Sequence, residues 1–302
     1  MWRTDRTLGK NRSVLSEGTV ERPDGRLVAW AEWGDPAGTP ILRLHGTPGS
    51  RLTRPLVPGL YERVGAHVVT VDRPGYGGST PQRERTWLSC ADDAIAVADA
   101  LGWETFGVTG GSGGAPHALA IGVRSPERVR VLGIVVPAAP PDLIDLDDMD
   151  DLNAESMRRA REGRDSLEAF IAPYGEKMMA DVAGAFDEIL AEANAPERDR
   201  ARIQEDELRA ILVESLTEAF ANGPQGWYDD SWYINTAWDF ALEDVAVPVH
   251  IWYGADDRAA PPRSVEAMAA RLNVASIECQ PGAHLGEPGR QEGIWRALVA
   301  AA

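Results

Sequence analysis

The stretch that decides the fold is FGVTGGSGGAPHALA, residues 106–120. Its first residues are typical of a β-strand and its last of an α-helix, and Ser112 stands at the turn between them. Small residues are needed here because strand and helix backbones come close at such a turn, so a side chain at Gly110 or Gly114 would clash. The pattern predicts that Ser112 presents its hydroxyl above the carboxyl edge of a sheet, near the positive end of the helix.

A glycine-rich turn with a serine also occurs in flexible loops and phosphate-binding turns, so a candidate nucleophile needs partners. A serine hydroxyl is a weak nucleophile at neutral pH and requires a base, which a third group orients. Of the five histidines in the chain, His284 follows a strand-like run and is expected in a loop at the carboxyl edge. His67 and His250 lie in or beside predicted strands and His117 lies in the helix after Ser112, which favours structural roles. The sequence therefore predicts His284 as the general base and acid.

The third group is expected after the strand-like run that ends at Tyr253, in the loop Gly254-Ala255-Asp256-Asp257. Either aspartate can accept a hydrogen bond from the histidine. The order of serine, aspartate and histidine along the chain, each in a loop after a strand, is the order found in serine hydrolases with an α/β fold.

A second glycine-containing turn, Leu44-His45-Gly46-Thr47-Pro48-Gly49, follows an earlier strand-like run. The tetrahedral intermediate of acyl transfer needs two preorganised N–H donors, which together form an oxyanion hole. The backbone N–H groups of Thr47 and Gly113 are the predicted pair. We expect His45 to shape this turn and not to transfer protons.

Strand-like and helix-like runs alternate along the first 140 residues and again after residue 247, which is typical of a mostly parallel sheet covered by helices. A turn at Pro23-Asp24-Gly25 predicts an opening hairpin. The predicted strands are Leu27–Trp33, Pro40–Leu44, His67–Val71, Thr105–Val108, Val131–Val136, Val247–Tyr253 and Ser276–Cys279, and the predicted helices include Thr86–Leu101 and Arg263–Leu272. Between the two halves lies an acidic helical block that ends near Asn222. We therefore expect a core domain formed by residues 1–139 and 238–302, with residues 140–237 inserted into it.

The chain resembles the α/β-hydrolase superfamily, in the branch that includes proline iminopeptidase-like and methyl-esterase-like enzymes. The matching motifs are HGTPG (45–49), DRPGYGGS (72–79), the Ser112 turn, GADD with a later proline (254–261) and GAH (282–284). They span the chain from about residue 25 to its end, apart from the inserted block. The resemblance implies that Asp257, three residues after the glycine that closes its strand, is the triad acid, and that His284 is the triad histidine.

The resemblance also implies that residues 140–237 form a helical cap, or lid, over the active site and shape the substrate pocket. Dehalogenases and epoxide hydrolases of this superfamily use aspartate as the nucleophile, so Ser112 disfavours both. Proline iminopeptidases usually carry tryptophan after the serine, where this chain has Gly113.

The formal charge of −17 is concentrated in the inserted block, where residues 139–237 hold 24 Asp and Glu against 9 Lys and Arg. This balance argues against nucleic acid or an anionic membrane as a partner, because binding phosphates requires a basic surface. A solvated helical face explains the charge better than an acidic recognition surface. Residues Met1–Arg6 lead into polar sequence instead of the apolar stretch of a signal peptide, and the two cysteines, Cys90 and Cys279, lie far apart, so we expect a cytoplasmic protein. No ligand spacing indicates a metal, and no cofactor is expected.

The predicted reaction is acyl transfer to Ser112 from a small-molecule ester, followed by hydrolysis. Alternatives are an aminopeptidase or amidase in which cap carboxylates such as Glu214 or Glu218 bind a substrate amine, a non-hydrolytic lyase or cyclase, and a non-catalytic ligand receptor. Four cap aromatics, Trp227, Tyr228, Trp232 and Tyr233, are predicted to line an apolar substrate pocket. They can equally pack the cap onto the core.

Overall fold

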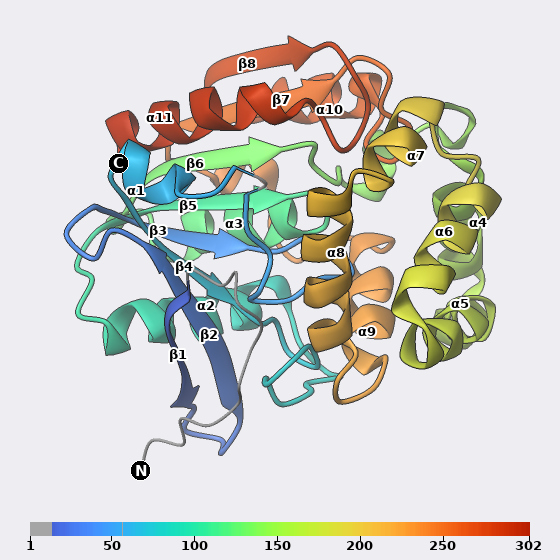
Figure 1. Cartoon of the computed structure of the whole chain (residues 1–302), viewed down its shortest axis with the longest axis horizontal. Helices are drawn as coiled ribbons and strands as arrows, with labels where there is room; N and C mark the ends of the chain where they lie inside the picture. Colours follow the sequence, from blue (N-terminus) through green and yellow to red (C-terminus); the bar gives the residue numbers. More distant parts are fainter. Residues whose placement is uncertain (1–13, 56) are drawn as a thin grey trace.

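The computed structural model describes residues 14–55 and 57–302, so the start of the chain at Met1–Arg6 lies outside the described residues. Eight strands form one sheet in the order β1-β2-β4-β3-β5-β6-β7-β8 (Figure 1). The strands are β1 (Val14–Glu21), β2 (Leu27–Gly34), β3 (Thr39–Leu44), β4 (Ala66–Val71), β5 (Phe106–Gly111), β6 (Val129–Val135), β7 (Val249–Gly254) and β8 (Val274–Gln280). The predicted hairpin is confirmed, since β1 and β2 pair antiparallel. In the sheet order, all neighbouring strands from β4 onward are parallel.

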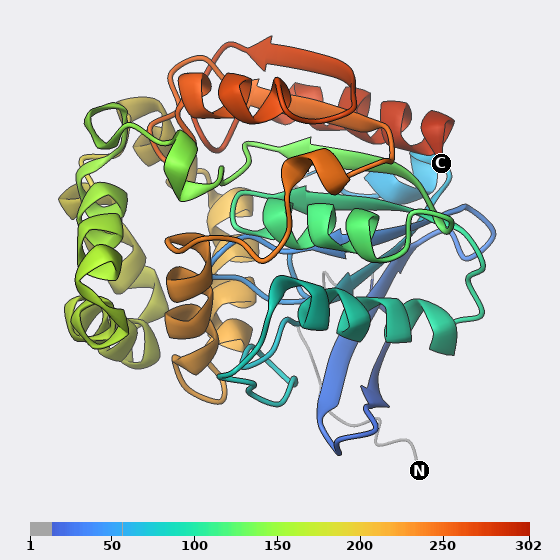
Figure 2. The same cartoon turned by 180° about the vertical axis from the view of Figure 1, so that it is seen from behind.

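Helices cover both faces of the sheet, as the predicted α/β architecture requires. On one face, α2 (Trp87–Ala100), α3 (Gly114–Arg124) and α10 (Pro262–Ala269) enclose the larger hydrophobic core. On the other, α1 (Leu60–Val64) and α11 (Gln291–Ala301) enclose a second core (Figure 2). All six residues of β4 are buried, which agrees with its mainly apolar sequence, AHVVTV.

Most predicted elements differ from the structure only at their ends. Strand β5 continues to Gly111, three residues beyond its predicted end, because Thr109 and the glycines after it still pair with β6. Helix α2 begins where predicted, since the Thr86 hydroxyl accepts the N–H of Ser89 and caps it. Helix α10 ends at Ala269, three residues short of its predicted end at Leu272.

The inserted block, residues 140–237, is called the cap segment below; it carries six α-helices and no strand. They are α4 (Asp151–Glu162), α5 (Arg164–Ala180), α6 (Val182–Glu192), α7 (Glu197–Ile203), α8 (Asp206–Ala219) and α9 (Gln225–Ile234). These helices lie beyond the carboxyl ends of the parallel strands, with α8 and α9 next to the sheet and α4 to α6 farther out (Figure 1). Short 3-10 turns occur at Pro141–Leu143, Leu146–Asp148, Leu242–Asp244 and Pro288–Arg290. The four aromatics predicted to line the pocket, Trp227, Tyr228, Trp232 and Tyr233, lie on α9.

Candidate active site

Ser112 occupies a strained turn between β5 and α3. Its φ is +53°, in the left-handed region that non-glycine residues rarely adopt. A Cβ at Gly110 would lie 2.6 Å from the carbonyl carbon of Gly114, and a Cβ at Gly114 would lie 2.9 Å from the carbonyl carbon of Leu44. The predicted need for small residues at these two positions is therefore confirmed. The turn places Ser112 in the wall of a cavity at the carboxyl edge of the sheet.

His284 and Asp257 meet beside this turn, although 27 residues separate them in the chain. Nδ1 of His284 lies 2.8 Å from Oδ2 of Asp257. The other carboxylate oxygen, Oδ1, accepts the N–H groups of Ala259 and Ala260, each at 2.9 Å, so Asp257 is fixed and only 2% exposed. Because a carboxylate only accepts, Nδ1 of His284 is the donor and Nε2 is left with a lone pair when the ring is neutral.

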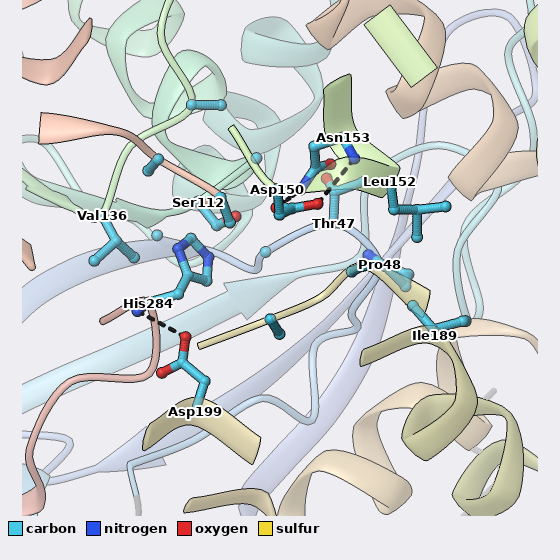
Figure 3. Close-up of a pocket in the computed structure, with 18 of the residues that line it drawn as sticks. Thr47, Pro48, Ser112, Val136, Asp150, Leu152, Asn153, Ile189, Asp199 and His284 are labelled. Carbon is cyan, nitrogen blue, oxygen red and sulfur yellow. Dashed lines mark hydrogen bonds between the residues drawn. The ribbon is translucent and has the colours of Figure 1, made fainter. Parts of the chain in front are cut away.

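Of the two aspartates in the loop, only Asp257 contacts His284. The side chain of Asp256 is 66% exposed and lies 3.9 Å from Arg198. In the view of Figure 3 the ring of His284 projects toward Ser112, and both residues line the same cavity. The structure thus brings together the three residues that the sequence predicts as a triad.

Three carboxylates surround His284 and control its charge. Burial alone would lower the pKa of the imidazole, but the charge and hydrogen bond of Asp257, with smaller contributions from Asp199 and Asp150, together outweigh burial and raise the pKa to about 9. Asp199 belongs to α7 and Asp150 caps α4, so two of the three carboxylates come from the cap segment. Burial raises the pKa of both these carboxyls.

The loop of residues 45–49 faces the serine turn. A Cβ at Gly46 would lie 3.7 Å from Cβ of Ser112, and Thr47 and Gly113 both line the cavity. A Cβ at Gly113 would lie 2.7 Å from Cβ of Thr47 and 2.8 Å from Cδ1 of Ile234. The position after the serine therefore has no room for a side chain, and the two predicted oxyanion residues pack directly against each other.

His45 supports this loop from behind and is only 1% exposed. Its Nδ1 lies 2.8 Å from the Gly46 carbonyl, which accepts the bond, and its Nε2 accepts the N–H of Arg73 at 3.3 Å. Burial, and next the charge of Arg73, hold the pKa of His45 well below its ordinary value. A neutral imidazole with both nitrogens engaged fits the shaping role expected from the sequence.

A buried ionic cluster joins the same loop to helix α9 of the cap segment. Asp230, with no exposed surface, accepts hydrogen bonds from Thr47 Oγ1 at 2.8 Å and from Arg73 Nε at 3.0 Å. Arg85 also donates to Asp230, and Arg73 donates to the carbonyls of His45 and Gly46. Although burial opposes the charge, the two guanidinium groups hold the pKa of Asp230 well below its usual range.

The candidate site opens into a cavity of about 470 Å³ between the core and the cap segment. Its wall is mainly aliphatic, with contributions from Met149, Leu152, Ile189, Leu208, Leu212 and Ile234. Among the polar residues of the wall, Figure 3 shows Ser112, His284, Asp150, Asn153 and Asp199. An apolar chamber with a few converging polar groups is typical of small-molecule sites.

Only one of the four predicted pocket aromatics lines this cavity. Trp227 is in its wall, 8% exposed. Tyr228 donates to the Ala172 carbonyl, Trp232 packs under Arg164, and Tyr233 donates to the Arg83 carbonyl and lies beneath Arg85. These contacts hold α9 against α5 and the core, which is the packing role that the sequence left open.

The carboxylates suggested as amine ligands are engaged elsewhere. Glu214 pairs with Arg54 at 2.6 Å and Glu218 with Arg51 at 2.7 Å. The carboxylates in the cavity wall are instead Asp150 and Asp199.

Sequence reasoning missed Asp150, Asp199 and Asp230 because they lie in acidic helical sequence with no motif around them. The available signal was a carboxylate among apolar or aromatic neighbours, as in Gly226–Ile234 around Asp230.

Within residues 14–55 and 57–302, no group of three or more His, Cys, Asp or Glu side chains is arranged to hold a metal ion. None of the helices in that part of the chain combines the length and the apolar character needed to cross a bilayer.

A family model described as "alpha/beta hydrolase fold" matches residues 39–286. The chain belongs to the α/β-hydrolase family. This α/β hydrolase is 31% identical over 125 residues to a proline iminopeptidase of Neisseria meningitidis serogroup A, a match that covers 40% of each chain. A proline iminopeptidase of Arabidopsis thaliana is 31% identical over 127 residues, covering 41% of this chain and 33% of that protein. The chain thus aligns with about two fifths or less of the length of these curated relatives.

Solved structures agree with the family. An α/β-hydrolase fold protein from Nakamurella multipartita superposes with a TM-score of 0.62 at 26% identity, covering 93% of this α/β hydrolase and 99% of that chain. A hydrolase from Pseudomonas aeruginosa PA01 superposes with a TM-score of 0.65 at 18% identity, covering 95% of this α/β hydrolase and 99% of that chain. The predicted fold and superfamily are confirmed, the iminopeptidase relatives support the predicted branch, and membership of the family supports a hydrolase.

Proposed function

We propose that this protein is a serine hydrolase that cleaves a small-molecule ester through an acyl-enzyme intermediate on Ser112. The observation that carries the proposal is the contact between His284 and the buried Asp257, 2.8 Å apart, with His284 in the same cavity wall as a serine held at φ +53°. A general base fixed by a carboxylate beside a serine that faces a cavity is the arrangement that nucleophilic catalysis by serine needs.

In the proposed mechanism, Oγ of Ser112 attacks the ester carbonyl carbon while Nε2 of His284 takes the hydroxyl proton. The N–H groups of Thr47 and Gly113 stabilise the oxyanion of the tetrahedral intermediate. When the intermediate collapses, the C–O bond to the alcohol breaks and His284 gives its proton to the departing oxygen. Water then attacks the acyl-enzyme by the same route, which restores Ser112. Asp257 keeps the imidazole in the tautomer that both half-reactions require.

The cavity supports an ester with an apolar acyl or alcohol part. Most of its wall is apolar, and a chamber of about 470 Å³ suits a small molecule better than a polymer. We propose that residues 140–237 act as the cap over this chamber and that neither nucleic acid nor a membrane is a partner. With Cys90 and Cys279 both free, we also propose a cytoplasmic location.

An aminopeptidase of the proline iminopeptidase type is the second candidate. The curated relatives carry that name, and Asp150 and Asp199 place carboxylates near His284, where a substrate amine would need a counter-charge. Against it stands Gly113, whose position is filled by Thr47 and Ile234 and leaves no space for the tryptophan usual in those enzymes. Both carboxylates also already accept bonds, Asp150 from Asn153 and Asp199 from backbone N–H groups.

The test compares hydrolysis of p-nitrophenyl esters of increasing acyl length with hydrolysis of proline p-nitroanilide. Wild type, Ser112→Ala and Ser231→Ala are assayed together, since Ser231 lies in the same cavity wall but outside the proposed triad. Ester turnover that Ser112→Ala removes and Ser231→Ala retains is the expected result. Faster turnover of the proline amide would select the aminopeptidase, and no turnover of either substrate would redirect attention to the lyase, cyclase or receptor alternatives.

A further inference from the structure

The cap segment reaches the loop of His284 through one buried carboxylate. Asp199, in helix α7, accepts the backbone N–H of His284 at its Oδ2 and the N–H of Leu285 at its Oδ1, each at 3.0 Å (Figure 3). The residue is 5% exposed, so water competes little for these bonds. Hydrogen bonds from N–H groups to a buried carboxylate are stronger than those between neutral groups.

The backbone of the His284 loop is also held at Gly282, whose carbonyl accepts the N–H of Asp256 at 2.9 Å, and at Ala283, whose carbonyl accepts the N–H of Gly286 at 3.2 Å. Gly282 and Gly286 bracket the histidine with φ of +115° and +59°, and glycine at such positions leaves the backbone with many accessible conformations. The bond from Nδ1 to Asp257 fixes the orientation of the ring, while Asp199 fixes the backbone from which the ring projects. The two aspartates therefore hold His284 from opposite elements, one in the core and one in the cap segment.

We propose that Asp199 is a positioning residue, through which the seating of cap helix α7 sets the place of His284 relative to Ser112. The inference rests on the proposed function, since His284 needs placing only if it acts as the base for Ser112. A displacement of about 1 Å between reacting groups can cost on the order of 100-fold in rate. The base is therefore in place only when α7 is docked against the loop of residues 281–286.

The charge of Asp199 gives the proposal a second readout. The charged groups that face His284 are Asp257 from the loop after β7, Asp199 from α7 and Asp150 from the start of α4, and all three favour the imidazolium. Removing the Asp199 charge lowers the pKa of His284, so the base becomes available at lower pH. A purely structural loss of cap stability would not shift the acid limb of the rate in this way.

The experiment measures the rate at which a fluorophosphonate labels Ser112, from pH 5 to 10. Labelling needs the base, but it does not depend on hydrolysis of an acyl-enzyme. The variants are Asp199→Asn and Asp199→Glu, with Asp181→Asn as the matched control. Asp181 also lies in the cap segment and accepts a backbone N–H, that of Gly184, but it caps α6 and is exposed. Thermal unfolding of each variant is recorded alongside.

We expect Asp199→Asn to lower the alkaline plateau of the labelling rate by roughly 10-fold to 100-fold. The acid limb of its pH profile should move to lower pH by about one unit. Asp199→Glu keeps the charge and both acceptor oxygens, so its acid limb should stay at the wild-type pH and its plateau rate should recover in part. Asp181→Asn should match the wild type in both respects.

A wild-type plateau in Asp199→Asn would overturn the proposal, as would an equal loss in Asp181→Asn. If Asp199→Asn unfolds, Asp199→Glu becomes the test. A pH profile of Asp199→Glu whose acid limb is displaced from that of the wild type would then count against the proposal. Failure of the wild-type protein to label at all would instead refute the proposed function.

Discussion

The two walls of the candidate site are built differently. The core wall supplies Ser112, Asp257 and His284 from loops after strands, and each stands in a short run rich in glycine or alanine. The cap wall supplies a largely apolar lining together with Asp199, which contacts the histidine loop, and behind that wall the buried Asp230 contacts the loop of residues 45–49. In the proposed function, the core thus carries the reacting groups, while the cap segment affects their position and charge.

The largest effect that would test this division is expected at Asp230. In Asp230→Asn the buried Arg73 and Arg85 lose their shared counter-charge, and breaking a buried pair in this way typically costs about 3–5 kcal/mol. Urea unfolding followed by tryptophan fluorescence measures the change. Asp187→Asn is the control, because Asp187 pairs with Arg209 near the surface, where an ion pair is worth less than about 1 kcal/mol. Similar losses in both variants would contradict the role given to the buried cluster.

The difference between the walls also explains what the sequence could predict. The sheet, the hairpin and the candidates Ser112 and His284 follow from local signals, because a strand, a tight turn and a loop each need particular residues within a few positions. The choice of Asp257 over Asp256 came from the family resemblance. Asp199 contacts a residue 85 positions away in the chain and Asp230 one 183 positions away, and no local pattern encodes such pairings. A cluster of aromatics in the cap sequence does not distinguish a pocket wall from helix packing.

The next effect concerns Gly113, where core and cap meet. In Gly113→Ala the new Cβ would collide with Thr47 and Ile234, which displaces one of the proposed oxyanion donors. Loss of one such donor costs about 100-fold to 1,000-fold in kcat, so we expect a drop of at least roughly 10-fold for a displaced donor. Gly293→Ala in α11, where a Cβ meets nothing within 4 Å, should leave kcat unchanged. Full activity in Gly113→Ala would exclude its N–H from the oxyanion hole.

A smaller effect is expected in the pH dependence of ester hydrolysis. The pKa of His284 is raised to about 9, and the protonated ring cannot accept the Ser112 proton. The value of kcat/KM should therefore fall as the pH drops through about 9, well above the ordinary histidine value near 6.5. Stopped assays with a pH-stable ester from pH 6 to 10 measure this limb. A limb at or below pH 6.5 would show that Asp257 and the two cap carboxylates together do not raise the pKa of the base.

The smallest effect separates two aromatics of helix α9. Trp227→Ala enlarges the cavity and should shift the preferred acyl length upward, with changes of about 10-fold or less between neighbouring esters. Trp232→Ala lies outside the cavity wall and should lower the unfolding temperature while keeping the wild-type order of preference. The ester series and thermal unfolding are compared for both. A changed preference in Trp232→Ala would place substrate against that face of the helix.

If Ser112 is the nucleophile, an acyl-enzyme on Ser112 can be trapped during turnover. The protein is mixed with an excess of a slowly deacylated p-nitrophenyl ester, quenched in acid within seconds and analysed by intact mass and peptide mapping. We expect a gain of one acyl group on the peptide that contains Ser112, together with a burst of p-nitrophenolate equal to the enzyme concentration. Ser112→Ala should show neither. An acyl group on another residue, or turnover that persists in Ser112→Ala, would contradict the assignment of Ser112 as the nucleophile.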